Sequence, residues 1–181
     1  GRDLELAQEA LELSTSIQYD IGIYESHIRI ARALMSCRKN EEAIEHLNIC
    51  YNLANSMNDA ERNARVSNLF GIAYHKLGVI SKSLEHFLEA LEISKSNGYA
   101  NIECQVYNNM CSILTELGDY ETALVYLQAL MEKISGNDQD IFPISFVFRN
   151  MAYTLYRMNR IEEAEKFAHM ALRESIRQDI P

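Results

Sequence analysis

The chain has 181 residues, 48% of them hydrophobic, with a formal net charge of −9, so long disordered segments are excluded and one domain or four to five short repeats are expected. An acidic chain repels nucleic acid and anionic membranes, and no 18 consecutive residues are apolar. We therefore predict no nucleic-acid binding and no membrane span.

Apolar residues recur three and four positions apart along the chain, which is the spacing of one helix face. With only two Pro and seven Gly, little interrupts these helices. The pattern predicts an all-α chain of about nine helices. Their expected ranges are 3–16, 20–37, 40–57, 60–77, 80–96, 100–117, 120–135, 142–158 and 161–178.

The helices form pairs that repeat every 40 residues, or 41 before the last pair. A small residue recurs midway along the first helix of each pair, at Ala31, Gly71, Cys111 and Ala152. Another recurs in the second helix, at Ala43, Ser83, Ala123 and Ala164. Small side chains let two helix axes approach closely. These columns therefore mark the predicted helix crossings.

The predicted turns follow the same period. Gly78 and Gly118 end first helices, where glycine supplies a left-handed cap, and Asn159 stands in the same column. Asp119 is placed to cap the next helix.

These features predict one repeat domain over 1–181, folded as an α-α superhelix. A half repeat precedes four full pairs: 3–16, then 20–57, 60–96, 100–135 and 142–178. The pattern begins and stops on a second helix, without the polar capping helix that solenoids normally carry. We expect the sequence to be a fragment of a longer protein whose end helices expose apolar faces.

The repeat resembles the tetratricopeptide repeat (TPR). Gly71, Tyr74, Gly78, Phe87 and Ala90 stand at the family positions, and the segment GDYETALVYLQAL from Gly118 matches as well. The usual Trp column is occupied instead by His27, Ser67, Tyr107 and Phe148.

The 40-residue period is longer than the usual TPR and is similar to the arrays of bacterial signalling proteins. Examples are the peptide-binding Rap and NprR-type regulators and the arrays that precede GGDEF diguanylate cyclase or histidine kinase domains. Kinesin light chains and LGN-type scaffolds have a similar long repeat. The resemblance implies a scaffold for protein–protein interaction, and any GGDEF or kinase output would lie outside these residues.

No nucleotide-binding loop, hydrolase elbow or zinc-protease motif is present, so we predict no enzyme, catalytic residue, cofactor or metal. His46 and His86 are one repeat apart and are interpreted as surface or half-buried positions. Glu85 and Glu89 are interpreted as part of a solvated helix face. Three of the four cysteines lie on apolar helix stripes, as core thiols do. Free core thiols fit a reducing cytosol, so we predict a cytoplasmic location.

In the TPR family the first helices line the concave surface. The register places six cations and two anions there, a charge of +4 in a chain of −9. Arginine and tyrosine are common binding anchors, and asparagine can pair with a peptide backbone. The predicted groove residues are Arg29, Arg32, Asn68, Lys76, Asn108, Asn109, Arg149, Asn150, Tyr153 and Arg157.

We predict that this groove binds a protein or an extended acidic peptide in bacterial-type signal transduction. The alternatives are that long helices merely need a polar inner face, that the end helices form a homodimer, or that the module senses a small molecule for an attached cyclase or kinase. The Lys/Asn set of carboxylate-clamp TPR domains is not reproduced, because Ile28, Arg32 and Phe146 occupy those columns.

Overall fold

The computed structural model describes residues 2–137 and 142–177, and within these ranges it contains nine α-helices and no strand. Each helix begins and ends within two residues of its predicted bounds, and the fold is that of a TPR-like repeat protein. The helices are α1 (Arg2–Ser16), α2 (Asp20–Ser36), α3 (Asn40–Ser56), α4 (Ala60–Lys76), α5 (Ile80–Asn97), α6 (Ala100–Leu117), α7 (Tyr120–Asn137), α8 (Ile144–Arg157) and α9 (Ile161–Arg177).

The turns recur about every 20 residues, and each turn that lies wholly within the described residues has a residue with positive φ. Gly78, Gly118 and Asn159 adopt this left-handed conformation, as predicted from their column. Arg38 and Asn58 adopt it too, although neither was predicted to do so. The turns share one further hydrogen bond, in which the amide after the left-handed residue donates to a carbonyl five residues back. Val79, for example, donates to Tyr74 at 2.9 Å.

Aspartates cap two of the helices. Asp59 accepts a hydrogen bond from the Arg62 amide at 2.9 Å, and Asp119 accepts one from Thr122 at 3.4 Å. The prediction for Asp119 is confirmed. α8 begins at Ile144, two residues later than predicted, because the residue before Pro143 is driven away from helical conformation.

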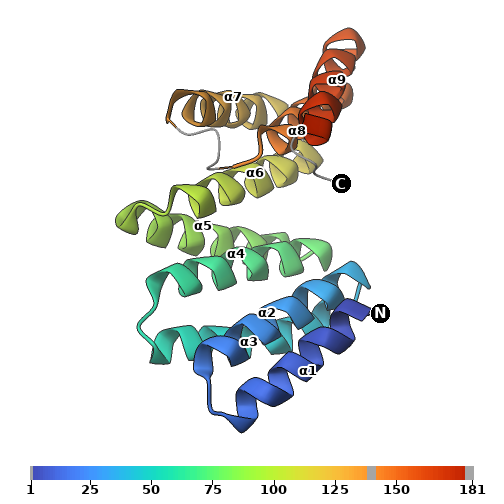
Figure 1. Ribbon diagram of the computed structural model, residues 1–181. Helices are drawn as coiled ribbons and strands as arrows, with labels where there is room; N and C mark the ends of the chain where they lie inside the picture. The colour runs from blue at the N-terminus through green and yellow to red at the C-terminus, as the bar shows by residue number, and fades with distance from the viewer. Residues whose placement is uncertain (1, 138–141, 178–181) are drawn as a thin grey trace. The chain divides into compact units, whose positions relative to one another are not determined.

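The chain divides into two compact units, Gly1–Ile102 and Glu103–Pro181. In unit 1, α1 packs on α2, α2 on α3, α3 on α4 and α4 on α5 (Figure 1). Its core includes Tyr24, Leu47 and Phe87, each at most 1% exposed. A Cβ on Gly71 would lie 2.5 Å from the Phe87 ring, so only glycine fits at this crossing.

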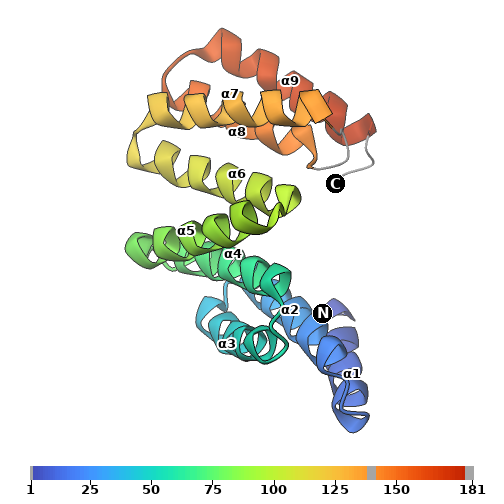
Figure 2. The same cartoon turned by 90° about the vertical axis from the view of Figure 1, so that its left-hand side faces the viewer.

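In unit 2, α8 packs against both α7 and α9 (Figure 2). Leu127, Val147 and Met151 are central in its core. Cys104 and Cys111 are also buried there as free thiols, as is Cys50 in unit 1. Burial raises the pKa of Cys50 and Cys111 to about 12, so both stay protonated and unreactive.

Candidate functional site

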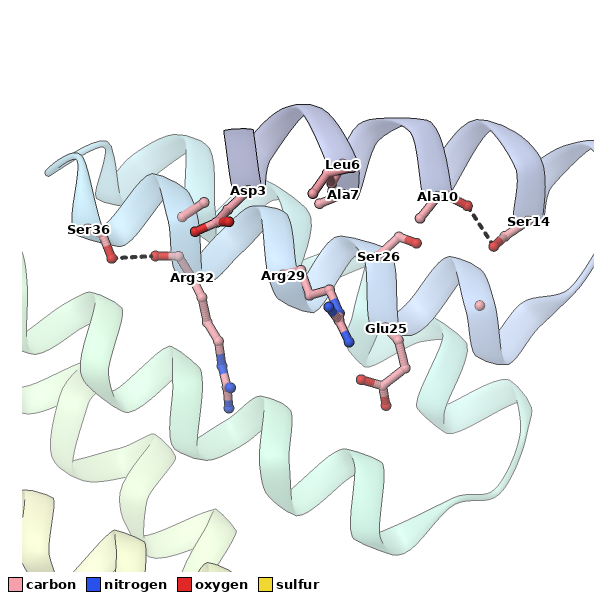
Figure 3. A pocket seen from close by; sticks show the side chains of 12 residues that line it. Asp3, Leu6, Ala7, Ala10, Ser14, Glu25, Ser26, Arg29, Arg32 and Ser36 are labelled. Carbon is pink, nitrogen blue, oxygen red and sulfur yellow. Dashed lines mark hydrogen bonds between the residues drawn. The ribbon is translucent and has the colours of Figure 1, made fainter. Parts of the chain in front are cut away.

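A groove of about 580 Å³ runs between α1 and α2 in unit 1 (Figure 3). The two helices approach closely beside it, since a Cβ on Gly22 would lie 2.5 Å from the Ser14 hydroxyl oxygen. Small side chains on α1 leave the space open. The lining residues are Asp3, Leu6, Ala7, Ala10 and Ser14 of α1 and Gly22, Glu25, Ser26, Arg29, Arg32, Ala33 and Ser36 of α2.

The groove has the position of a helix-packing surface. One period later, Ala7, Ala10 and Ser14 correspond to Leu47, Cys50 and Ala54 of α3, all fully buried. There α2 packs on α3, and the Cys50 thiol donates to the Tyr24 carbonyl at 3.6 Å. By the repeat symmetry, the groove between α1 and α2 has the shape to accept one further helix.

Arg29 and Arg32 form the charged edge of this groove. Figure 3 shows their side chains leaving α2 on the side away from α1, together with Glu25. Glu25 is already paired with Arg65 of α4, at 3.2 Å. Within the described part of the chain neither Arg29 nor Arg32 makes a salt bridge. Desolvation and the nearby Arg65 charge lower the pKa of Arg32, and both would be compensated by a bound carboxylate.

The other two predicted residues of unit 1 lie outside the groove, on α4. Lys76 is exposed in the last turn of α4. Asn68 is only 4% exposed. Burial removes Asn68 from the side chains that a bound peptide could contact.

Two predicted residues of unit 2 bind each other. The Asn150 amide donates to the backbone carbonyl of Asn108 at 3.0 Å and to its side-chain oxygen at 2.9 Å. Next to them, the Thr115 and Thr154 hydroxyls lie 2.8 Å apart. The expectation that Asn108 and Asn150 clamp a peptide is therefore wrong: both are buried and link α6 to α8.

Exposed arginines and tyrosines lie on α8. The Arg157 guanidinium donates to the Tyr153 hydroxyl at 3.0 Å and lies over the rings of Tyr153 and Tyr120. Arg149 lies 4.9 Å from the centre of the Phe146 ring and is also exposed. Arginine stacked on an aromatic ring keeps its charge and outward N–H groups for a partner.

The structure thus places Arg29 with Arg32 in one groove and Tyr153 with Arg157 in one contact. Asn109 is half-buried on α6. One continuous groove over all four repeats stays a prediction.

Glu89 does not lie on a solvated helix face, so that prediction is wrong. Its carboxylate is half-buried and accepts hydrogen bonds from the Tyr51 hydroxyl at 3.1 Å and from His86 Nδ1 at 3.3 Å. Tyr51 is 38 residues away, so the periodicity of α5 alone could not show this contact. Exposed Glu85 is as predicted.

Residues 2–137 and 142–177 contain no group of three His, Cys, Asp or Glu side chains that could hold a metal ion. No helix in the same ranges is long and apolar enough to cross a membrane.

The helical repeat defines the class of fold, which is that of a TPR-like repeat protein. No profile of a known protein family matches the chain. Among curated proteins, the chicken (Gallus gallus) 43 kDa receptor-associated protein of the synapse is 24% identical over 123 residues, or 68% of this chain. The chain spans 30% of that relative's length.

Solved structures with the same fold include apo RapI, with a TM-score of 0.73 and 17% identity over 96% of this chain and 46% of that one. BtubC (BKLC) from P. vanneervenii has a TM-score of 0.63 and 17% identity, and the match covers 98% of this chain and 91% of BtubC. The TPR-like repeats of a putative kinesin light chain from Podospora anserina have a TM-score of 0.65 and 12% identity. That match covers 98% of this chain and 87% of the kinesin light chain structure.

Proposed function

We propose that this module binds an acidic segment of a partner protein, and that the groove between α1 and α2 is its main contact in unit 1. The observation that carries the proposal is the pair Arg29 and Arg32, two cations at the edge of a helix-sized groove with no salt bridge among the described residues. In a chain of net charge −9, such cations attract a negative partner while the remaining surface repels it.

A short amphipathic segment with acidic residues fits this groove. Its apolar side would cover Leu6, which is 53% exposed, and the small residues of α1. Its carboxylates would pair with Arg29 and Arg32. This is the arrangement by which helices bind grooves, with apolar anchors for affinity and charges for register.

We propose a separate contribution from α8 of unit 2, where Arg149, Tyr153 and Arg157 are exposed. Tyr and Arg are enriched among the residues that carry binding energy. Lys76 and Asn109 complete the set of predicted residues that remain accessible in part, in unit 1 and unit 2 respectively.

A peptide array tests this function. Acidic and basic ten-residue peptides would be probed with the protein and with the Arg29→Glu/Arg32→Glu variant. We expect acidic peptides to bind, binding to weaken with salt, and the double variant to lose it. Arg38→Glu, an exposed turn residue that does not line the groove, should bind normally. Equal binding by the groove variant and the control would overturn the proposal.

We further propose that the module is the interaction segment of a longer cytoplasmic signalling protein of bacterial type. The fold match to RapI, which spans 96% of this chain but 46% of that one, supports this context. Sensing of a small molecule for an attached cyclase or kinase is the alternative, and testing it requires the full-length protein.

Self-association is a second candidate function, favoured by exposed apolar residues on the end helices. Leu13 of α1 is 65% exposed, and Leu172 and Ile176 of α9 are 59% and 71% exposed. Such side chains can pair with a second copy. Sedimentation at rising concentration tests this: a dimer lost in Leu172→Glu/Ile176→Glu supports it, and a monomer throughout rules it out.

A further inference from the structure

The second repeat lacks an aromatic contact that the other repeats make where their two helices cross. His27 and His46 have ring centres 5.0 Å apart, Tyr107 and Tyr126 5.8 Å, and Phe148 and Phe167 6.0 Å. In the second repeat these two columns hold Ser67 and His86.

His86 stacks on other rings instead. Its ring centre lies 4.8 Å from that of Phe70 and 5.4 Å from that of Tyr74, with the Tyr74 ring parallel to within 1°. Beside this stack, α3, α4 and α5 enclose an open pocket of about 460 Å³. It is lined by Asn48, Tyr51, Phe70, Tyr74, Glu85, His86 and Glu89.

A fixed negative charge lies in this pocket. Glu89 accepts hydrogen bonds from His86 and from Tyr51, and the His86 hydrogen bond is the main reason that the pKa of Glu89 is lowered. Glu89 is therefore ionised at neutral pH, and its position is held by both donors. Glu85 adds a second, exposed carboxylate to the lining.

The pocket already has a cation beside it. The Lys82 ammonium lies 5.1 Å from the centre of the Tyr74 ring. This contact shows that the outer face of Tyr74 accepts a positive group. Lys82 does not line the pocket and belongs to a flexible, exposed side chain, so a better-fitting cation can displace it.

We propose that this pocket of α3, α4 and α5 binds an arginine side chain of a partner protein. A guanidinium stacks flat on an aromatic ring and donates to a carboxylate in the same plane, which a lysine ammonium cannot do. Tyr74 supplies the ring, and Glu85 and Glu89 supply the acceptors. The site is independent of the groove between α1 and α2, since other residues line it and it selects a cation.

The first test uses three small probes: Nα-acetyl-arginine amide, the matching lysine amide and the neutral isostere Nα-acetyl-citrulline amide. Ring signals of Tyr51 and Tyr74 are followed by NMR. We expect saturable shifts with the arginine probe, weaker binding of the lysine probe and none with citrulline. Equal effects of arginine and citrulline, or tighter binding of lysine, would overturn the proposal.

Variants separate binding from folding. Tyr74→Leu and Glu85→Gln should each weaken the arginine probe about two- to fivefold, while Glu92→Gln, an exposed change on the same helix away from the pocket, should not. Lys82→Gln should strengthen binding about twofold or more, because the competing cation is removed. A damaged fold cannot produce that gain, so weaker or unchanged binding in Lys82→Gln contradicts the proposal.

Discussion

The first helix of each repeat carries polar side chains at similar positions in both units, but the polar side chains compared here are buried in unit 2 and exposed in unit 1. In unit 2, Asn108 and Asn150 are buried and bonded to each other. In unit 1, Arg29 and Arg32 are exposed and make no salt bridge within the described ranges. An amide has both donors and an acceptor, so two amides can satisfy each other in the core, whereas two guanidinium groups only donate and repel. The functional group of a polar side chain therefore decides whether two such side chains can pair in the core or stay exposed to a binding partner.

The largest loss of stability should come from the close crossing of α4 and α5 at Gly71 in unit 1. The losses from the polar substitutions below can be compared with it. Leucine at Gly71 would overlap the Phe87 ring, so Gly71→Leu should lower the free energy of unfolding by about 3 kcal/mol. Urea denaturation measures this. Exposed Glu92→Leu on α5 is the control and should cost less than about 0.5 kcal/mol. A similar cost at both positions would show that the register is wrong.

The asparagine pair should give the next largest effect. Asn150→Ala leaves the Asn108 side-chain oxygen buried without its donor, which should cost about 1–3 kcal/mol in urea denaturation. Replacing both partners, in Asn108→Leu/Asn150→Leu, removes the unpaired group and should recover most of that loss. If the double variant instead loses further unfolding free energy relative to Asn150→Ala, as two independent substitutions would, the two asparagines do not satisfy each other's hydrogen bonds.

The period of 40, the small columns and the turn residues were enough to predict the helices of both units, because helix spacing and left-handed caps are local properties. The sequence could not show which polar residues of a column are buried. Asn108 is buried because Asn150 reaches it from α8, and Glu89 is held because Tyr51 reaches it from α3. The pocket of α3, α4 and α5 depends in the same way on residues of three helices, among them Tyr51, Tyr74 and Glu85, which periodicity alone does not bring together.

A third kind of polar pair sharpens the comparison, because it can change charge. His27 and His46 Nδ1 atoms lie 2.7 Å apart, so one must be neutral and accept. Burial lowers both pKa values, and for His46 the nearby Glu45 and Glu42 oppose the shift only in part. The folded state thus binds fewer protons than the unfolded state, and stability is lost as pH falls below about 6.5.

The double variant His27→Phe/His46→Phe, which copies the Phe148–Phe167 pair of the fourth repeat, should flatten this pH dependence while keeping ring packing. Thermal melts between pH 5 and pH 7.5 measure it. His169→Gln, an exposed change on α9, should keep the wild-type profile. An unchanged slope in the double phenylalanine variant would exclude the histidine pair as its source.

The variant Arg29→Gln/Arg32→Gln removes both positive charges of the groove between α1 and α2. It should have the smallest effect on stability, and it tests the proposed binding function most directly. Melting temperature and affinity for the acidic peptides selected on the array are measured on one preparation. We expect the melting temperature to stay within about 2 °C of wild type and the affinity to fall about tenfold or more, because charge-assisted hydrogen bonds to the peptide are lost. A lower melting temperature with unchanged affinity would show that these arginines serve folding, and the proposed function would be wrong.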